Sequence, residues 1–184
     1  MGNKNVDINS KLIDSARKGD QQAMYRLYKL YVQAMYNTCI RMVSNQFDAE
    51  DIIQESFVKA FNNLDSFRGE SSFGSWLKRI VINQSITFLR KKKQNFQDID
   101  DLQILADEDE ENSFPEIDPM MIHESIKTLP EKARVVLNLY LLEGYIHKEI
   151  ADILNITEST SKSQYLRAKQ LLREKLEKEI RYEY

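Results

Sequence analysis

Turn-forming residues are scarce in this chain, which has only 5 Gly and 3 Pro among 184 residues. A β-sandwich or β-barrel needs frequent turns rich in these residues, so their scarcity argues against an all-β fold. Long helices joined by short connections need few of them. With 42% hydrophobic and 30% charged residues, the chain has the composition of a folded protein. We therefore expect an all-α fold.

Charge is distributed unevenly along the chain, although the net charge is only −3. Residues 1–97 hold 15 Lys/Arg and 9 Asp/Glu, whereas residues 98–118 hold 10 Asp/Glu and no cation. Residues 119–184 hold 11 Lys/Arg and 10 Asp/Glu. Such segregation is typical of separate modules. We expect two small helical domains, at 8–97 and 119–184, joined by an acidic linker. The linker is either a solvated spacer or a polyanion that occupies a basic channel on a partner.

Hydrophobic periodicity and capping residues predict where the helices lie. The expected helices before the linker span residues 9–18, 20–43, 48–64 and 71–93. After the linker, the sequence TLPE predicts a helix start with Thr128 as its cap, and this helix is expected to stop at Gly144. Two short helices and a long amphipathic C-terminal helix are expected to follow.

The helix expected at 48–64 has polar and apolar sides, with acidic and amide side chains concentrated in its first two turns. This face suits the helix dipole, and it is either a solvated surface or a docking site for a basic or amide-rich partner. The candidate docking residues are Asp48, Glu50, Asp51, Gln54 and Glu55.

The stretch NNLDSFRGESSF and the helix after it combine aromatic, hydroxyl and cationic side chains. We expect Phe67, Phe73 and Trp76 to be partly exposed, because they lie where the loop meets the helix. Aromatic rings beside cations at such a place can stack unpaired bases. The four cations at residues 90–93 would contact phosphates. A hydrophobic core with a solvated basic tail fits the pattern equally well. The candidate DNA-binding residues are Phe67, Arg68, Ser71, Ser72, Phe73, Trp76, Lys78, Arg79, Asn83, Arg90 and Lys91.

A helix-turn-helix pattern covers residues 145–176, with a plain helical hairpin as the alternative. Ala151 is small where the two helices would cross, Asn155 occupies the turn, and Thr157 is expected to cap the second helix. Asn155 stands where glycine is usual, and Ser161 stands where an aliphatic residue is common, which we expect to loosen the packing. The candidate residues for contacts with duplex DNA are His147, Lys148, Ser159, Thr160, Lys162, Ser163, Gln164 and Arg167.

Several classes of protein find no support in the sequence. His123 and His147 lie far apart without ligands at metal-binding spacing, and no phosphate-binding loop or nucleophile motif occurs, so we expect no metal, no cofactor and no enzymatic activity. Apolar runs are too short for a membrane span, and the N-terminus lacks a secretory signal. The single Cys39 fits a reducing cytoplasm, and we expect it to be a small buried hydrophobe.

Taken in order and spacing, the three motifs resemble the sigma-70 family, in particular its extracytoplasmic-function (ECF) group, over residues 8–176. DAEDIIQESFVKAF is similar to the family's core-binding segment, FRGESSFGSWLKRIVIN to its promoter-melting and −10 region, and the stretch from LPEKARVV to QYLRAK to its −35 domain. The resemblance implies a region 2 helical bundle and a region 4 helix-turn-helix domain.

The resemblance also implies roles. The acidic residues would dock on the coiled-coil clamp of the polymerase β′ subunit, and the loop at 67–73 would capture a flipped −10 base. The helix at 159–169 would read the −35 element, while the last domain would hold the β flap. Family members are commonly held inactive by an anti-sigma factor, so core RNA polymerase, promoter DNA and an anti-sigma factor are the expected partners, with no small-molecule substrate.

Two other functions remain open on the sequence. One is a free-standing helix-turn-helix regulator that binds duplex DNA as a dimer, although such a protein has no use for a polymerase-docking face. The other is a sigma-like interaction module that sequesters polymerase or another factor without initiating transcription.

Overall fold

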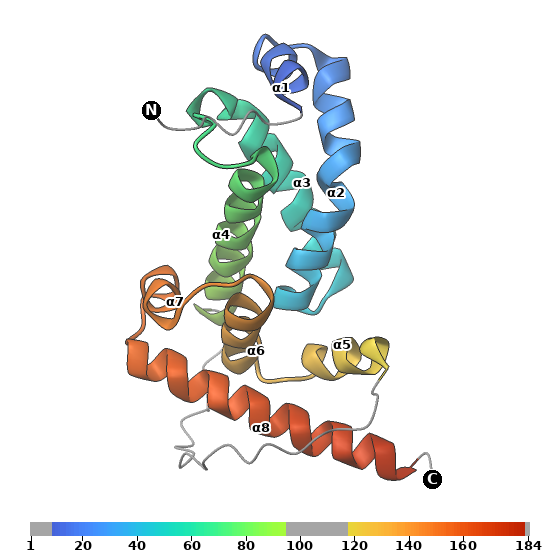
Figure 1. Ribbon diagram of the computed structural model, residues 1–184, viewed down its shortest axis with the longest axis vertical. Helices are drawn as coiled ribbons and strands as arrows, with labels where there is room; N and C mark the ends of the chain where they lie inside the picture. Colours follow the sequence, from blue (N-terminus) through green and yellow to red (C-terminus); the bar gives the residue numbers. More distant parts are fainter. Residues whose placement is uncertain (1–8, 95–117, 183–184) are drawn as a thin grey trace. The chain divides into compact units, whose positions relative to one another are not determined.

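The computed structural model describes residues 9–94 and 118–182, and within these ranges the chain forms helices and turns without a strand (Figure 1). The all-α prediction is confirmed. The contacts divide the chain into two compact units, residues 1–96 and 97–184. Apart from Asp118, the expected acidic linker lies outside the described residues.

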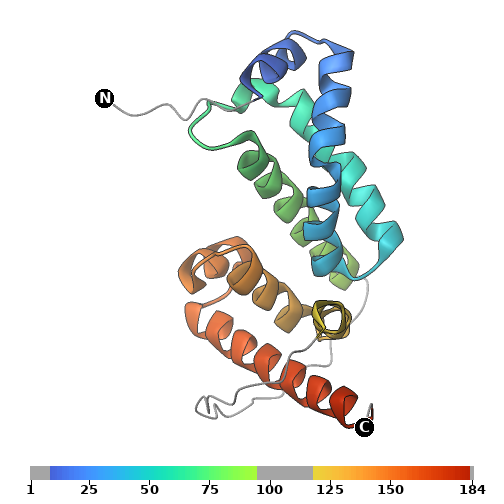
Figure 2. The ribbon, with the colours of Figure 1, turned by 45° about the vertical axis from the view of Figure 1, so that its right-hand side comes forward.

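The first unit is a helical bundle with a short extra helix at one end. It consists of α1 (Ser10–Arg17), α2 (Gln21–Val43), α3 (Gln46–Asn62), the 3₁₀ turn η1 (Leu64–Ser66) and α4 (Phe73–Gln94). Helices α2, α3 and α4 pack against one another in all three pairs, and α1 packs on α2 (Figures 1 and 2). Their facing sides bury Leu27, Met42, Phe57, Leu77 and Val81.

Local capping determines where these helices begin. The Asp20 carboxylate accepts hydrogen bonds from the backbone N–H groups of Gln22 and Ala23, which starts α2. Helix α3 begins earlier than the sequence suggested, because the Asn45 side chain accepts from the Asp48 N–H at 3.0 Å. Asp48, at which the sequence predicted this helix to begin, is therefore not its N-cap. It lies in the first turn, where its charge still complements the helix dipole.

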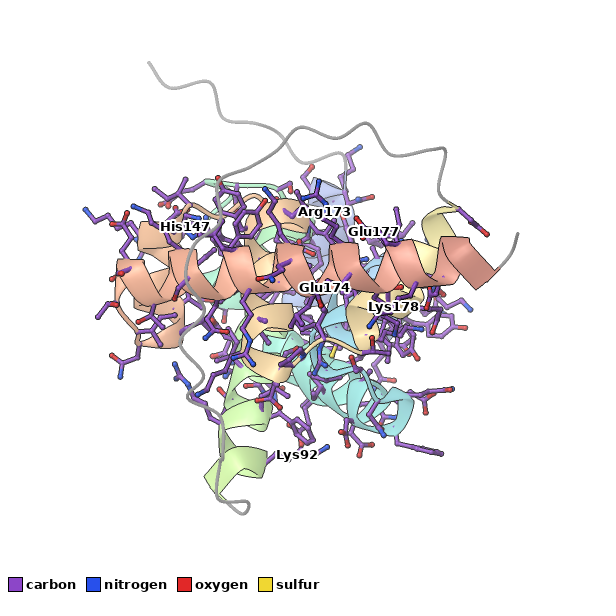
Figure 3. All side chains as sticks on the ribbon, turned by 90° about the horizontal axis from the view of Figure 1, so that it is seen from below. Lys92, His147, Arg173, Glu174, Glu177 and Lys178 are labelled. Carbon is purple, nitrogen blue, oxygen red and sulfur yellow. The ribbon has the colours of Figure 1, made fainter. Side chains whose placement is uncertain are left out.

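The second unit contains α5 (Pro119–Lys127), α6 (Glu131–Leu137), the π-helical turn η2 (Asn138–Leu142), α7 (His147–Leu154) and α8 (Glu158–Tyr182). Helix α8 packs on α5, α6 and α7. The core gathers Ile126, Leu129, Ala133, Leu137 and Ala168. The C-terminal half of α8 is rich in charge, with Arg173 Nε 3.7 Å from the Glu177 carboxylate (Figure 3).

The predicted helix start at TLPE is correct in place but wrong in its cap. Thr128 ends α5 instead of capping α6, and its hydroxyl donates to the Ser125 carbonyl at 2.8 Å. Pro130 precedes α6 and provides no side-chain cap. This helical segment ends just before Gly144, as expected, and Gly144 has φ at 77°, but the last turn of the segment is π-helical. Among the described helices, none is long and apolar enough to cross a membrane.

Candidate nucleic-acid and protein interfaces

The acidic face predicted on the third helix is present on α3. Glu50, Asp51, Gln54 and Glu55 are exposed, whereas the opposite side of α3 is buried in the bundle. Asp48 differs from them because it is half-buried, and its carboxylate lies 3.0 Å from Lys92 Nζ at the end of α4. Four of the five candidate docking residues are therefore open to solvent, and the fifth is paired within its own unit.

Two exposed apolar residues on the same face were missed from the sequence. Phe47 is 78% exposed and Val58 is 59% exposed. With Asp51 and Gln54 they follow the spacing i, i+4, i+7 and i+11, which places all four on one stripe of the helix. That spacing was visible in the sequence, but both apolar residues would have been assigned to the core by default. The face thus combines acids with apolar side chains at both ends.

A hollow of about 510 Å³ opens between the loop after η1 and the start of α4. Gly69 has φ at 73°, a conformation that glycine adopts without strain, and this turns the loop over the hollow. The Ser72 hydroxyl accepts from the Ser75 N–H at 3.2 Å and so caps α4. The hollow is lined by Ser66, Phe67, Arg68, Glu70, Ser71, Trp76 and Arg79.

The expectation that three aromatic rings are partly exposed here is wrong for two of them. Phe73 is fully buried and Phe67 is only 7% exposed. Phe73 packs edge-on against Tyr31 of α2 at 5.2 Å and against Phe67 at 5.6 Å. This mutual packing withdraws both phenyl rings from solvent, because a cluster of edge-to-face aromatic rings is more favourable buried than solvated. Trp76 alone of the three is half-buried, and its ring lies 5.5 Å from each of the other two.

The remaining candidates on α4 form two separate groups. Arg79 lines the hollow and Lys78 is half-buried beside it, whereas Arg90 and Lys91 are exposed at the far end of the helix. At a rise of 1.5 Å per residue, the fourteen helical steps from Trp76 to Arg90 span about 21 Å. Exposed Asn83 lies between the two groups. Two members of the hollow, Ser66 and Glu70, were not predicted, although both belong to the quoted stretch.

The helix-turn-helix prediction is confirmed by the backbone. Asn155 ends α7 in the left-handed conformation with φ at 55°, as an asparagine in place of glycine can. The Ile156 N–H donates to the Ala151 carbonyl, and the Thr157 hydroxyl accepts from the Thr160 N–H at 3.0 Å, which caps α8. Ala151 is buried where α7 meets α8.

The expected loosening at Ser161 is wrong. Ser161 is fully buried, and its hydroxyl is hydrogen-bonded to His147 Nδ1 at 2.9 Å. The His147 ring also stacks on Tyr140 of η2, with ring centroids 4.3 Å apart and planes at 14°. Burial and then the nearby Lys162 ammonium lower the pKa of His147, while Glu158 opposes them. A polar pair replaces the usual aliphatic contact between the two helices.

The candidate contact residues of α8 are only partly available. Ser159, Thr160, Lys162 and Ser163 are exposed near the start of α8, and Lys148 is exposed on α7. Gln164, Arg167 and His147 are half-buried. Lys162 Nζ lies 2.7 Å from the Glu158 carboxylate, and this hydrogen bond lowers the pKa of Glu158. Glu158 was not predicted, although it opens the helix.

Cys39 is buried in the bundle, as predicted. Burial raises the pKa of its thiol to about 11, against a smaller opposing effect of the hydrogen bond from Ser85. Such a thiol is a poor nucleophile at neutral pH. Within residues 9–94 and 118–182, no cluster of His, Cys, Asp and Glu could hold a metal ion.

An all-α chain with an exposed acidic helix, a loop hollow lined by aromatic and cationic side chains, and a separate helix-turn-helix unit has the make-up of a transcription initiation factor of the sigma-70 type. Two family models match it: Sigma-70 region 2 over residues 27–95 and Sigma-70, region 4 over residues 120–172. The chain belongs to the ECF group of RNA polymerase sigma factors.

Curated relatives cover almost the whole chain. The ECF RNA polymerase sigma factor SigW of Bacillus subtilis is 35% identical in an alignment of 183 residues. The alignment covers 90% of this chain and 95% of the relative. The ECF RNA polymerase sigma-E factor of Escherichia coli K12 is 32% identical over 184 residues, spanning 92% and 95%. The polymerase-dependent function therefore holds, and the free-standing regulator is rejected.

Solved structures support the same family. The sigma factor RpoE of Bartonella quintana, in complex with the anti-sigma factor NepR, matches with a TM-score of 0.55 and 25% identity, over 83% of this chain and 96% of that one. CnrH, in complex with the cytosolic domain of CnrY, shares the fold with a TM-score of 0.51 and 20% identity, over 91% and 96%.

Proposed function

We propose that this sigma factor divides promoter recognition between its two units, with residues 8–97 acting as region 2, residues 98–118 as a linker and residues 119–184 as region 4. The observation that carries the proposal is the hollow after η1. It is the right kind of site for an unpaired base, because a half-buried indole at Trp76 lies beside the guanidinium groups of Arg68 and Arg79. Trapping such a base holds the DNA strands apart.

The first unit docks on polymerase and melts the −10 element. The acidic face of α3 contacts the coiled-coil clamp of β′. Its polar contacts are Glu50, Asp51, Gln54 and Glu55. Their exposure supports this role. One DNA strand would place an unpaired base in the hollow and then run along α4. Its phosphates would contact the polar and cationic side chains of Lys78, Asn83, Arg90 and Lys91. Ser71 and Ser72 add hydroxyl groups at the mouth of the hollow.

The second unit reads the −35 element as duplex DNA and holds the β flap. Short hydroxyl and cationic side chains at the exposed start of α8 suit phosphate and base-edge contacts. We assign the direct contacts to Lys148, Ser159, Thr160, Lys162 and Ser163. Gln164 and Arg167 are contacts at the edge of this surface, and His147 acts chiefly by supporting α8.

The protein acts by binding and not by catalysis, and its place of action is the cytoplasm, where polymerase works. An anti-sigma factor is the expected regulator. One matched structure, RpoE of Bartonella quintana, is a sigma factor bound to an anti-sigma factor, which supports this expectation for the present chain.

Run-off transcription with purified core polymerase tests the proposal. Core alone is compared with core plus this protein on a pool of genomic upstream fragments. Discrete new transcripts are expected, and their start sites identify the −10 and −35 sequences. Binding to core without new transcripts would contradict initiation and favour the sequestering module. Absence of both would contradict the docking role of α3.

A further inference from the structure

Helix α1 lies outside the residues matched by the region 2 model, which begins at residue 27. It nevertheless contacts η1, the turn that leads into the loop over the hollow. In Figure 2, α1 and this loop lie at the same end of the first unit. Arg17, the last residue of α1, makes polar interactions at this contact.

The guanidinium of Arg17 makes several interactions at this point. Its Nη2 donates to the Phe67 carbonyl at 3.0 Å, across 50 residues of sequence. Its Nη1 donates to the Asp14 carboxylate at 3.0 Å, and its Nε lies 3.7 Å from the Asp65 carboxylate. One planar group therefore joins α1 to η1 and to the first loop residue after it.

The bond to the Phe67 carbonyl acts directly on the wall of the hollow. Phe67 lines the hollow, and its backbone leads into Arg68, which lines it too. The Phe67 ring is held from the other side by Phe73 and Trp76. Arg17 itself is absent from the lining, so it holds the loop without touching what enters the hollow.

From this geometry we infer that Arg17 is a positioning residue for base capture, so that α1 belongs to the −10 recognition apparatus. The inference rests on the proposed role of the hollow. A hydrogen bond from a charged donor to a backbone carbonyl holds the loop more firmly than a neutral one. Without it, the backbone from Phe67 to Gly69 gains conformational freedom, and the hollow must be ordered each time a base enters.

The test uses holoenzyme assembled from core polymerase and full-length protein. Fluorescence anisotropy measures its affinity for the labelled non-template strand of a promoter found by run-off transcription. Abasic substitutions, one position at a time, identify the position at which loss of a base weakens binding most. The ratio of the two dissociation constants, abasic over intact, is the base discrimination of the hollow.

Arg17→Ala is expected to lower this ratio about tenfold, because a charge-assisted hydrogen bond that orders the site is lost. Arg17→Lys keeps the charge but not the planar fork, so it should retain an intermediate ratio. Arg26→Ala, which removes an exposed arginine of α2, is the matched control and should leave the ratio unchanged. Affinity for core polymerase and the melting temperature should be equal for Arg17→Lys and the control.

An unchanged ratio in Arg17→Ala would overturn the inference. So would a parallel fall of base discrimination, polymerase affinity and melting temperature in both Arg17 variants, since that pattern means general destabilisation. If the wild-type holoenzyme shows no sensitive position at all, base capture by the hollow fails together with the inference. That result is distinct, because it appears in the wild type and not in the variants.

Discussion

The hydrogen bond between His147 and Ser161 joins the two helices of the helix-turn-helix. Because Ser161 is fully buried, its hydroxyl would cost about 1–3 kcal/mol if it had no partner. The groups facing His147 are the rings of Tyr140 and Tyr165 and the charges of Lys162 and Glu158. Burial first, and Lys162 next, disfavour the imidazolium.

This environment predicts a pH dependence of the second unit. The pKa of His147 is lower in the folded state, so the unfolded state binds the proton more readily. Neutral His147 therefore contributes its full share to the stability of the second unit above the ordinary histidine pKa of ~6.5. This stabilisation is lost as the pH falls below that value. Hydrogen exchange of the α7 and α8 amides, corrected for intrinsic rates, should show less protection at acid pH. His147→Gln should remove that fall, whereas His123→Gln should keep it. An equal fall in His147→Gln would contradict the prediction.

Trp76 is the residue of the aromatic cluster that reaches the hollow, so its loss should affect DNA opening. Stacking contributes about 1–3 kcal/mol per base, and Trp76→Ala should slow opening by roughly ten- to a hundredfold. The closed complex should still form, because the docking face of α3 is unaltered. Trp76→Phe keeps a stacking ring and is the matched control. Permanganate reactivity of thymines in the bubble measures opening, and equal reactivity in wild type and Trp76→Ala would refute this role.

At the scale of elements, an ion pair between Asp48 and Lys92 joins α3 to the end of α4 (Lys92 is labelled in Figure 3). Asp48 belongs to the candidate polymerase face, and Lys92 lies at the basic end of α4, for which we propose DNA contacts. Asp48 cannot pair fully with Lys92 and with a cation of polymerase at once. If Asp48 contacts polymerase as proposed, docking would break its ion pair with Lys92 and free the Lys92 ammonium for a phosphate.

Lys92→Ala should consequently raise the affinity for core polymerase. A surface ion pair contributes about 0–1 kcal/mol, so the gain should not exceed about fivefold and should shrink at high salt. Lys91→Ala, its exposed neighbour, is the matched control. In an Asp48→Asn background the effect of Lys92→Ala should vanish. If Lys92→Ala strengthens binding equally in that background, the pair does not mediate the coupling.

Periodicity and capping residues predicted most of the helices, because single residues such as Gly144 and Asn155 carry their own conformational preference. They missed α5, and one short helix, α7, lies between Gly144 and α8 where two were expected. Tertiary packing decided what they did not predict. Nothing local distinguishes Phe67 and Phe73 from Trp76, but in the fold Phe73 packs on Tyr31 of α2 and Phe67 packs on Phe73. Likewise, Arg17 reaches Phe67 across a separation that no pattern along the chain reveals.

At the scale of the whole molecule, one chain forms two compact units, for which we propose different tasks. The order of motifs predicted three separate candidate surfaces, on α3, at the loop before α4 and at the start of α8, but the hollow itself was found only in the structure. Each surface offers few contacts alone. Joint attachment to polymerase raises the effective concentration of the second DNA-binding surface once the first is engaged. A defect in one unit should therefore leave the contacts of the other intact.

Lys162→Ala tests this division. Lys162 is exposed at the start of α8, and if it contacts a phosphate, its loss should reduce the salt dependence of promoter binding by about one counterion. Initiation should weaken on promoters that depend on the −35 element, because the contact is made there. Lys178→Ala, in the C-terminal half of α8 (Figure 3), removes an equal charge away from that surface and is the control. Affinity for core polymerase should equal that of wild type in both variants. Loss of polymerase binding in Lys162→Ala would contradict the division, because the same side chain would then serve both partners.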